Sequence, residues 1–450
     1  MKTTSIPATA LSLLLTTCAL PALAGAEQEA GTAASAANGQ EPQALVAMIS
    51  PPAQQVPLPE TGAETGQPGA NDAGPEEEPT AAATNRQEER AYAAAIQELE
   101  SSEGAYAEAL PESLFSLARN LQSQGRHEEA IKLFKRGAHL TRINEGLYCP
   151  QQIPLVQGEI ASYIASENYT LADERQSYLY RVEMQLESGD ARTLALLQQA
   201  KWQYSAYQLG LSGPQGYTRL MNMWELYRQA LDDVTLREGK TSPKLLPPLH
   251  GMLQAQYLIS GYEYQDSDQV FTEDGRVNES LLQFKAYRAQ SYQLGSDIIQ
   301  AISGLAEQQG TQTSETRAQG LVMLGDWRLW NGRREDAWQA YREAETELAR
   351  EDDAQAELDQ LFGEPVALPA LEDLSPLPPA VDPAQADVLL AFGVSENGRV
   401  RDLERMDDNE AEDRQASRLM RQLRKTTFRP RFEAGQPVET EKLVKAFSIQ

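Results

Sequence analysis

The sequence has few of the side chains on which most enzymes and metal sites depend. It contains two cysteines and three histidines in 450 residues. No histidine lies in an HExxH or other ligand spacing, and the chain has no GxSxG, Walker or GxGxxG motif. Its many carboxylates are spread over expected helix surfaces, where a solvated face explains them better than an acid/base pair. We therefore predict a non-enzymatic protein with no catalytic residues, no metal ligands and no cofactor.

Positive charge is also scarce, and so are long apolar runs. The chain has 39 Lys and Arg against 66 Asp and Glu, a formal net charge of -27. A field of this sign repels nucleic acid, which excludes it as a partner. Beyond the first 24 residues no apolar run is long enough to cross a bilayer, so the mature chain is expected not to span a membrane.

Residues 1–24 have the pattern of a signal peptide. An apolar run from Ala8 to Leu20 follows a short positive start, and Pro21 precedes Ala22-Leu23-Ala24, an A-x-A cleavage pattern. We predict export to the periplasm. Two alternatives remain open, a retained N-terminal membrane anchor and a lipid anchor at Cys18.

A low-complexity segment follows the signal. Residues 25–86 consist largely of Ala, Gly, Pro, Glu, Gln and Thr, with almost no large apolar side chains. Such a segment cannot bury enough surface to offset the entropy of ordering. We predict a disordered Pro/Ala/Glu-rich spacer, which serves either as a tether or as a merely tolerated leader.

Residues 87–362 have the apolar periodicity of amphipathic helices. The clearest unit is an αα-hairpin in which Gly125 makes the turn. Small and large apolar residues alternate on its two facing stripes, so the helices can approach closely. The packing residues of this unit are Leu114, Leu117, Ala118, Leu121, Ala130 and Phe134. A hairpin of this kind must stack on neighbours to cover its outer face, which predicts a helical array.

This unit resembles the tetratricopeptide repeat (TPR). A second match lies downstream, with Leu321, Leu324, Gly325, Ala337, Tyr341 and Ala344 on the corresponding positions. Between the two matches the pattern weakens, and the number of repeats stays open. The resemblance implies a mainly α fold, a TPR-type helical-hairpin solenoid with a groove that binds other proteins.

The last part of the chain changes its period. Residues 363–385 form a Pro-rich linker, which marks a domain boundary. Residues 386–450 then read as two strands, a helix and two further strands, a small α+β module of order ββαββ.

This module resembles the TonB C-terminal domain. The matching residues are Gly398, Val400, Phe428, Pro430, Gly435, Val438 and Phe447. In that family a sheet edge receives an extended peptide of an outer-membrane receptor, so the resemblance implies docking by strand addition. A TonB energy transducer normally keeps an uncleaved N-terminal helix and a lysine-rich spacer, whereas this chain has a signal-like start and acidic spacers that lack the lysines.

The helix of the module has a basic outer face formed by Arg414, Arg418, Arg421 and Lys425. The residues form either an ordinary solvated face or a patch for an acidic partner.

Together these features predict a periplasmic adaptor or scaffold that binds envelope proteins. The partners would be envelope or outer-membrane proteins, held through a TPR groove and a TonB-like sheet edge. The alternatives are a TonB-type energy transducer for outer-membrane transport, suggested by the C-terminal resemblance alone, and an enzyme that uses the helical array as a cradle.

Overall fold

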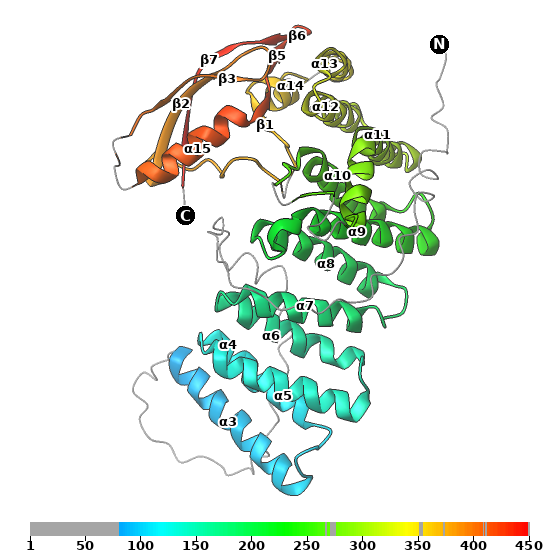
Figure 1. Ribbon diagram of the computed structural model, residues 1–450, viewed down its shortest axis with the longest axis vertical. Coiled ribbons are helices and arrows are strands. Elements are labelled where there is room, and N and C mark those ends of the chain that lie inside the picture. Colours follow the sequence, from blue (N-terminus) through cyan, green and yellow to red (C-terminus); the bar gives the residue numbers. More distant parts are fainter. Residues whose placement is uncertain are drawn as a thin grey trace, which may run out of the picture. The chain divides into compact units, whose positions relative to one another are not determined.

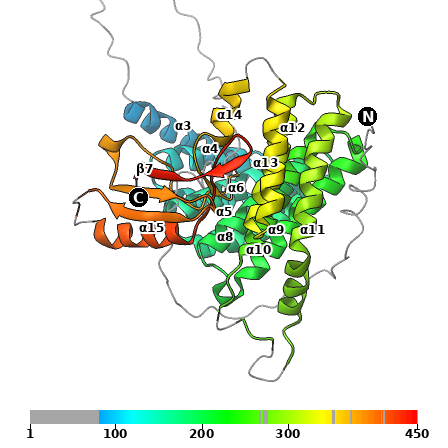
Figure 2. The same ribbon diagram turned by 90° about the horizontal axis from the view of Figure 1, so that it is seen from above.

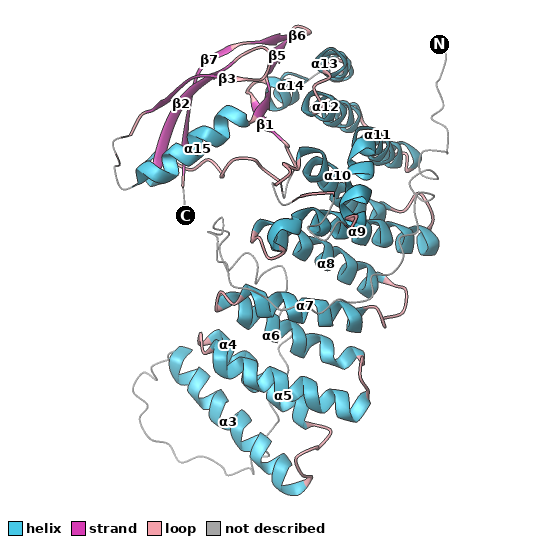
Figure 3. Cartoon of the chain, in the orientation of Figure 1, coloured by secondary structure: helices cyan, strands magenta, loops and turns pink. Residues whose placement is uncertain are grey.

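The structure is a computed structural model that describes residues 81–265, 268–270, 276–350, 354–371, 374–407, 409 and 412–448. The expected signal peptide and Cys18 lie outside these residues, as does the expected spacer up to residue 80. The described chain is mainly α-helical with a small sheet region at its C-terminal end, as predicted (Figures 1 and 3). It forms two compact units, one that ends at Leu211 and one that begins at Ser212.

The first unit consists of helices that each pack on the helices before and after them in the chain. They are α3 (Ala81–Ser102), α4 (Leu110–Ser123), α5 (His127–Glu145), α6 (Ile153–Ala165), α7 (Tyr169–Glu183) and α8 (Asp190–Gln208), with a short 3-10 turn η1 (Pro150–Gln152). Helix α3 thus begins six residues inside the expected spacer. Nearest-neighbour packing of this kind is what helical repeats require.

Close helix packing in this unit depends on glycine. The fully buried ring of Phe134 on α5 lies over Gly158 on α6, where an added Cβ would sit 2.5 Å from the ring. Phe134, Ile160 and Leu179 belong to one apolar core shared by α4 to α8. The aromatic side chain of one hairpin therefore fills space that the glycine of the next leaves free.

The second unit begins with another series of helices. They are α9 (Gly216–Glu238), α10 (Leu246–Gly261), α11 (Glu279–Gln308), α12 (Ser314–Trp330), α13 (Arg334–Leu348) and α14 (Ala354–Phe362), with 3-10 turns η2 (Gly213–Gln215) and η3 (Pro243–Leu245). Figure 2 shows α12 and α13, the second TPR-like hairpin, lying side by side. The ring of Tyr341 on α13 covers Gly325 on α12, as Phe134 covers Gly158 in the first unit.

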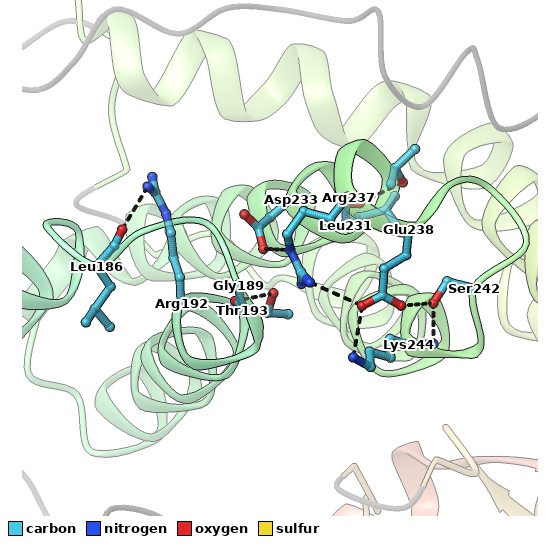
Figure 4. Close-up of polar contacts among 11 residues, drawn as sticks. Leu186, Gly189, Arg192, Thr193, Leu231, Asp233, Arg237, Glu238, Ser242 and Lys244 are labelled. Atoms are coloured by element: carbon cyan, nitrogen blue, oxygen red, sulfur yellow. Dashed lines mark hydrogen bonds and ion pairs between the residues drawn. The ribbon is translucent and has the colours of Figure 1, made fainter.

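Polar side chains close the turn between α9 and η3 (Figure 4). The Glu238 carboxylate accepts hydrogen bonds from Lys244 Nζ at 2.9 Å and Ser242 Oγ at 2.7 Å, and these bonds lower the pKa of Glu238. In the first unit, Arg192 and Thr193 of α8 donate to the backbone oxygens of Leu186 and Gly189, which secures the α7–α8 connection (Figure 4). These hydrogen bonds provide partners for a carboxylate at the end of α9 and for two carbonyl oxygens in the connection before α8.

The C-terminal module contains a three-stranded antiparallel sheet of order β3-β2-β7. Its strands are β2 (Val388–Val394), β3 (Val400–Arg405) and β7 (Thr440–Phe447). Helix α15 (Asp413–Lys425) lies along one face of this sheet, where Phe392 contacts a core that includes Leu419 and Leu423 (Figure 1).

After α15 the module differs from the expected ββαββ order, because three short strands come before β7. They are β4 (Thr427–Arg429), β5 (Arg431–Glu433) and β6 (Gln436–Val438). Pro430 has no N–H to donate, and it separates β4 from β5. Ala434 and Gly435 have φ of 50° and 78° and make the turn between β5 and β6.

The segment 363–385, expected to be a linker, takes part in the fold. Its strand β1 (Val366–Leu368) pairs antiparallel with β4. Farther along, Val381 N donates to Ala446 O of β7 at 2.9 Å, and Ala380 bridges to Phe447. A 3-10 turn η4 (Pro383–Gln385) leads into β2.

Candidate protein-binding surfaces

The TPR-like residues are packing residues in the structure. Leu114, Ala118, Leu121, Ala130, Phe134, Gly325, Ala337, Tyr341 and Ala344 are buried, and Leu117, Leu321 and Leu324 are half-buried. They hold the hairpins α4–α5 and α12–α13 together, and any ligand would contact other side chains.

Two of the TonB-like residues, Gly398 and Phe428, meet where β4 begins. Phe428 N donates to Gly398 O at 2.9 Å, and an added Cβ at Gly398 would collide with the Phe428 carbonyl oxygen. Gly398 also has φ of 70°, so glycine is required there for two reasons. Phe428 and Phe447 are buried in the core under α15, and Val400 packs on that core. Pro430 is buried, whereas Val438 and Gly435 are half-buried.

A buried ion pair joins the module to helix α12. Arg429 Nη1 of β4 lies 3.0 Å from Asp326 Oδ2, and the Tyr341 hydroxyl donates to Asp326 Oδ1 at 2.8 Å. Asp326 and Arg429 are each about 5% exposed. Burial raises the pKa of Asp326, while Arg429 and Tyr341 act in the opposite direction. A charged side chain is tolerated in such a buried site only when a partner of opposite charge compensates it.

Aromatic packing surrounds this ion pair. Phe432 of β5 lies 5.5 Å from Tyr341, 5.7 Å from Phe362 and 6.3 Å from Trp338, measured between ring centroids. Gly435 N donates to Glu345 Oε2 of α13 at 2.9 Å. The module is therefore held in one orientation on α12, α13 and α14.

The outer edge of β7 has main-chain groups that no described strand pairs. Because Val381 N donates to Ala446 O, the main-chain groups of Ala446 point away from β2. The groups two residues earlier, at Val444, point the same way, and the register with β2 shifts beyond Leu443. The segment at Val381 covers only the C-terminal end of β7, so the edge from Thr440 to Lys445 stays unpaired in the described chain.

The opposite edge strand, β3, is less suited to pairing. Asp402 has φ of 49°, and the β2–β3 register shifts between Ala391 and Gly393. Just before β3 begins, Gly398 O already accepts a hydrogen bond from Phe428 N. A bulged, charged edge of this kind discourages strand addition. The register of β7 with β2 shifts as well, between Phe392 and Val394, but from Leu443 to Phe447 the pairing is regular, so this stretch of β7 is the better candidate.

The basic residues of α15 lie on its exposed face. Arg414, Arg418, Arg421 and Lys425 are all exposed, while Ala416, Leu419 and Leu423 face the core. Lys425 Nζ lies 3.5 Å from Glu263, between two largely exposed side chains, so this contact adds little stability. The face carries positive charge in a strongly acidic protein.

Three further findings concern metal ligands, the free thiol and membrane-spanning helices. Among the described residues, no group of three or more His, Cys, Asp or Glu is placed to hold a metal ion. Cys149 is half-buried, with its Sγ 3.8 Å from Thr141 O. A search of the described helices for one long and apolar enough to cross a membrane finds none.

Sequence analysis missed the buried charged residues. Asp326, Glu159 and Glu183 are each at most 5% exposed, and each lies on a helix that contributes to a core. Asp326 follows GLVMLG and Glu159 lies within IPLVQGEIASYI. A single acid inside a mainly apolar helical stretch was the available signal, because such a residue is rarely buried without a partner.

Comparisons with known proteins give little further information. No protein-family model matches this sequence, and no curated protein matches it significantly. Among solved structures, the chain has a likeness to BtubC (BKLC) from P. vanneervenii, with 12% identity and a TM-score of 0.31. The match covers 59% of this chain and 91% of that one. A likeness at this score carries no conclusion about this chain.

Proposed function

We propose that this chain is an exported, non-enzymatic adaptor that holds envelope proteins, with the outer edge of β7 as a docking point for an extended peptide. The observation that carries this proposal is the unpaired edge from Thr440 to Lys445 on a module that is anchored by Arg429 and Asp326. An anchored edge loses no orientational freedom when a peptide binds. The signal-like N-terminus and the TonB-like residues support the compartment and the mode of binding.

The proposed peptide adds a strand beside β7. The main-chain N–H and C=O groups of Val444 would provide the central hydrogen bonds, and neighbouring side chains would provide selectivity. The Val444 side chain is 52% exposed and gives an apolar contact at the centre of this edge. The helical repeats would hold a second protein, which makes the chain an adaptor.

The test removes one main-chain donor from the edge. In Val444→Pro the outward N–H is lost, and proline is tolerated on an edge strand when that N–H faces away from the sheet. Val444→Thr is the matched control because it keeps the N–H and suits a strand. Both proteins, checked for folding by circular dichroism, would be used in pulldowns from envelope extracts.

We expect the wild-type chain and Val444→Thr to retain the same envelope protein and Val444→Pro to lose it. Equal recovery by folded Val444→Pro would contradict the proposed edge. Mass spectrometry of the mature N-terminus tests the compartment separately. A chain that starts near Gly25 supports export with cleavage and excludes the contact with membrane motor proteins that an energy transducer needs.

A further inference from the structure

A pocket of about 330 Å³ lies between helices α5, α6 and α7 of the first unit. Its wall includes Lys135 and Arg142 from α5, Glu159 and Tyr163 from α6, and Arg175 and Tyr178 from α7. The volume is at the low end of the range for small-molecule sites. The pocket is separate from the β7 edge and plays no part in the proposed docking of a peptide.

The pocket contains a buried carboxylate oxygen that accepts no hydrogen bond from the described residues. Glu159 is fully buried, and Arg175 donates to its Oε2 from Nε at 2.9 Å and from Nη2 at 2.8 Å. Within the described residues, Glu159 Oε1 has no hydrogen bond, and Lys135 Nζ stands 4.0 Å away. Burial raises the pKa of Glu159, against the effect of Arg175 and Lys135. An unpaired buried acceptor is costly, and a ligand that donates to it removes that cost.

Positive charge surrounds this oxygen. Lys135 and Arg142 have exposed side chains at the mouth of the pocket, and Arg175 already neutralises Glu159. Glu174 also lines the pocket, so its three cations exceed its two carboxylates by one, in a chain whose overall charge is -27. Cations near a partly enclosed site attract and bind carboxylates.

Two tyrosines contact Lys135 and Arg175 and hold these side chains in place. Lys135 Nζ lies 5.3 Å from the centre of the Tyr163 ring, and Arg175 Cζ lies 4.7 Å from that of Tyr178. The Tyr178 hydroxyl donates to Gln152 Oε1 at 2.5 Å, which fixes the ring. Such contacts arrange the charged groups before a ligand arrives.

We propose that this pocket binds a small organic acid that carries a hydroxyl or amine donor close to its carboxylate. The carboxylate lies between Lys135 and Arg142, and the donor bonds to Glu159 Oε1. The ligand needs both its carboxylate and its donor. An acid without a donor leaves Glu159 Oε1 without a hydrogen bond, and a neutral donor provides no carboxylate for Lys135 and Arg142.

The test compares three probes of equal chain length by isothermal titration calorimetry on the full chain. Gluconate has both groups, hexanoate has only the carboxylate, and gluconamide has only the donors. We expect gluconate to bind at least about tenfold more tightly than either, a difference of about 1.4 kcal/mol. Lys135→Gln should weaken gluconate binding by a similar factor, and Lys132→Gln, on the exposed face of α5 outside the pocket, should leave it unchanged.

Glu159→Gln should reduce the preference for gluconate over hexanoate. This variant also removes the charge that pairs with Arg175, so Lys135→Gln decides the outcome if Glu159→Gln fails to fold. The proposal is overturned if gluconate does not bind, if the three probes bind equally, or if Lys135→Gln binds gluconate as the wild-type chain does.

Discussion

Single buried acids in this protein are stabilised by different partners. Asp326 pairs with Arg429, and Glu159 pairs with Arg175. No ion pair is found for Glu183 among the described residues. Its Oε2 accepts a hydrogen bond from Gln199 Nε2 at 3.1 Å, and burial raises its pKa to about 7. Glu183 is therefore the buried acid whose charge is least compensated, and its protonation should affect the stability of the first unit.

We predict that the first unit becomes less stable as pH rises from about 4.5 to about 7. The unfolded chain has an ordinary Glu pKa of 4.5, so between these values the folded state binds more protons, and stability falls with rising pH. The shift corresponds to about 3 kcal/mol at most. Glu183→Gln should remove this loss, which urea denaturation at pH 4.5 and pH 8 would measure.

Glu187→Gln, an exposed substitution in the same segment, is the control and should leave the pH dependence as in the wild-type chain. Equal stability of Glu183→Gln and the wild-type chain at pH 8 would show that the Glu183 charge is not destabilising. This pair could not be predicted from sequence, because Gln199 is on the next helix and no local pattern links the two residues.

At the scale of helices, sequence periodicity predicted the parts that local rules determine. Gly125 and Gly332 have φ of 74° and 75° and end α4 and α12 in the same way. In both turns the N–H of the next residue bonds back to a carbonyl five residues earlier, at 3.0 and 2.9 Å. Both helices thus end at a glycine with positive φ, as a glycine between two amphipathic helical stretches predicts. The last two expected strands are each divided, the first into β4 and β5 and the second into β6 and β7, and this was missed because three-residue strands leave no period to detect.

The contact between Gly325 and Tyr341 gives a prediction for the α12–α13 hairpin. A Cβ at position 325 would collide with the Tyr341 ring, which is fully buried and cannot move away. We expect Gly325→Ala to destabilise the second unit by about 1–3 kcal/mol in spite of its better helix propensity. Thermal denaturation followed by circular dichroism would measure the change.

The same substitution at Gly304 is the matched control. Gly304 lies inside α11, and its added Cβ would meet only Gln308 Nε2, at 4.0 Å. There the gain in helix propensity should stabilise the unit by about 0.5–1 kcal/mol. Effects of the same sign at both glycines would rule out the steric explanation.

At the scale of the whole chain, the sequence indicated the mainly α class and the small C-terminal sheet, but not how the module is anchored. Asp326 and Arg429 are 103 residues apart in the sequence, and neither lies in a sequence motif that indicates its partner. Segment 363–385 has the prolines of a linker, yet β1 pairs with β4. Contacts between distant segments depend on three-dimensional complementarity, which periodicity in one dimension does not encode.

The buried ion pair should therefore couple the stability of the module to that of α12 and α13. Arg429→Met leaves Asp326 buried without a cation and should cost the second unit about 3–5 kcal/mol. Asp326→Leu should cost a similar amount, because it leaves Arg429 unpaired. The double variant has no buried charge and should cost clearly less than the sum of the two, which urea denaturation would show as a large coupling energy.

Hydrogen exchange distinguishes this coupling from a local defect in the module. If α12 and the module form one cooperative structure, Arg429→Met lowers the protection of amides in α12 and α13 as well as in β4 and β5. Arg421→Met, on the exposed face of α15, is the control and should leave all four elements protected. Loss of protection confined to β4 and β5 would mean that the module opens independently. The orientation of the β7 edge would then not be fixed by the helices, and the proposed docking edge would move with the module.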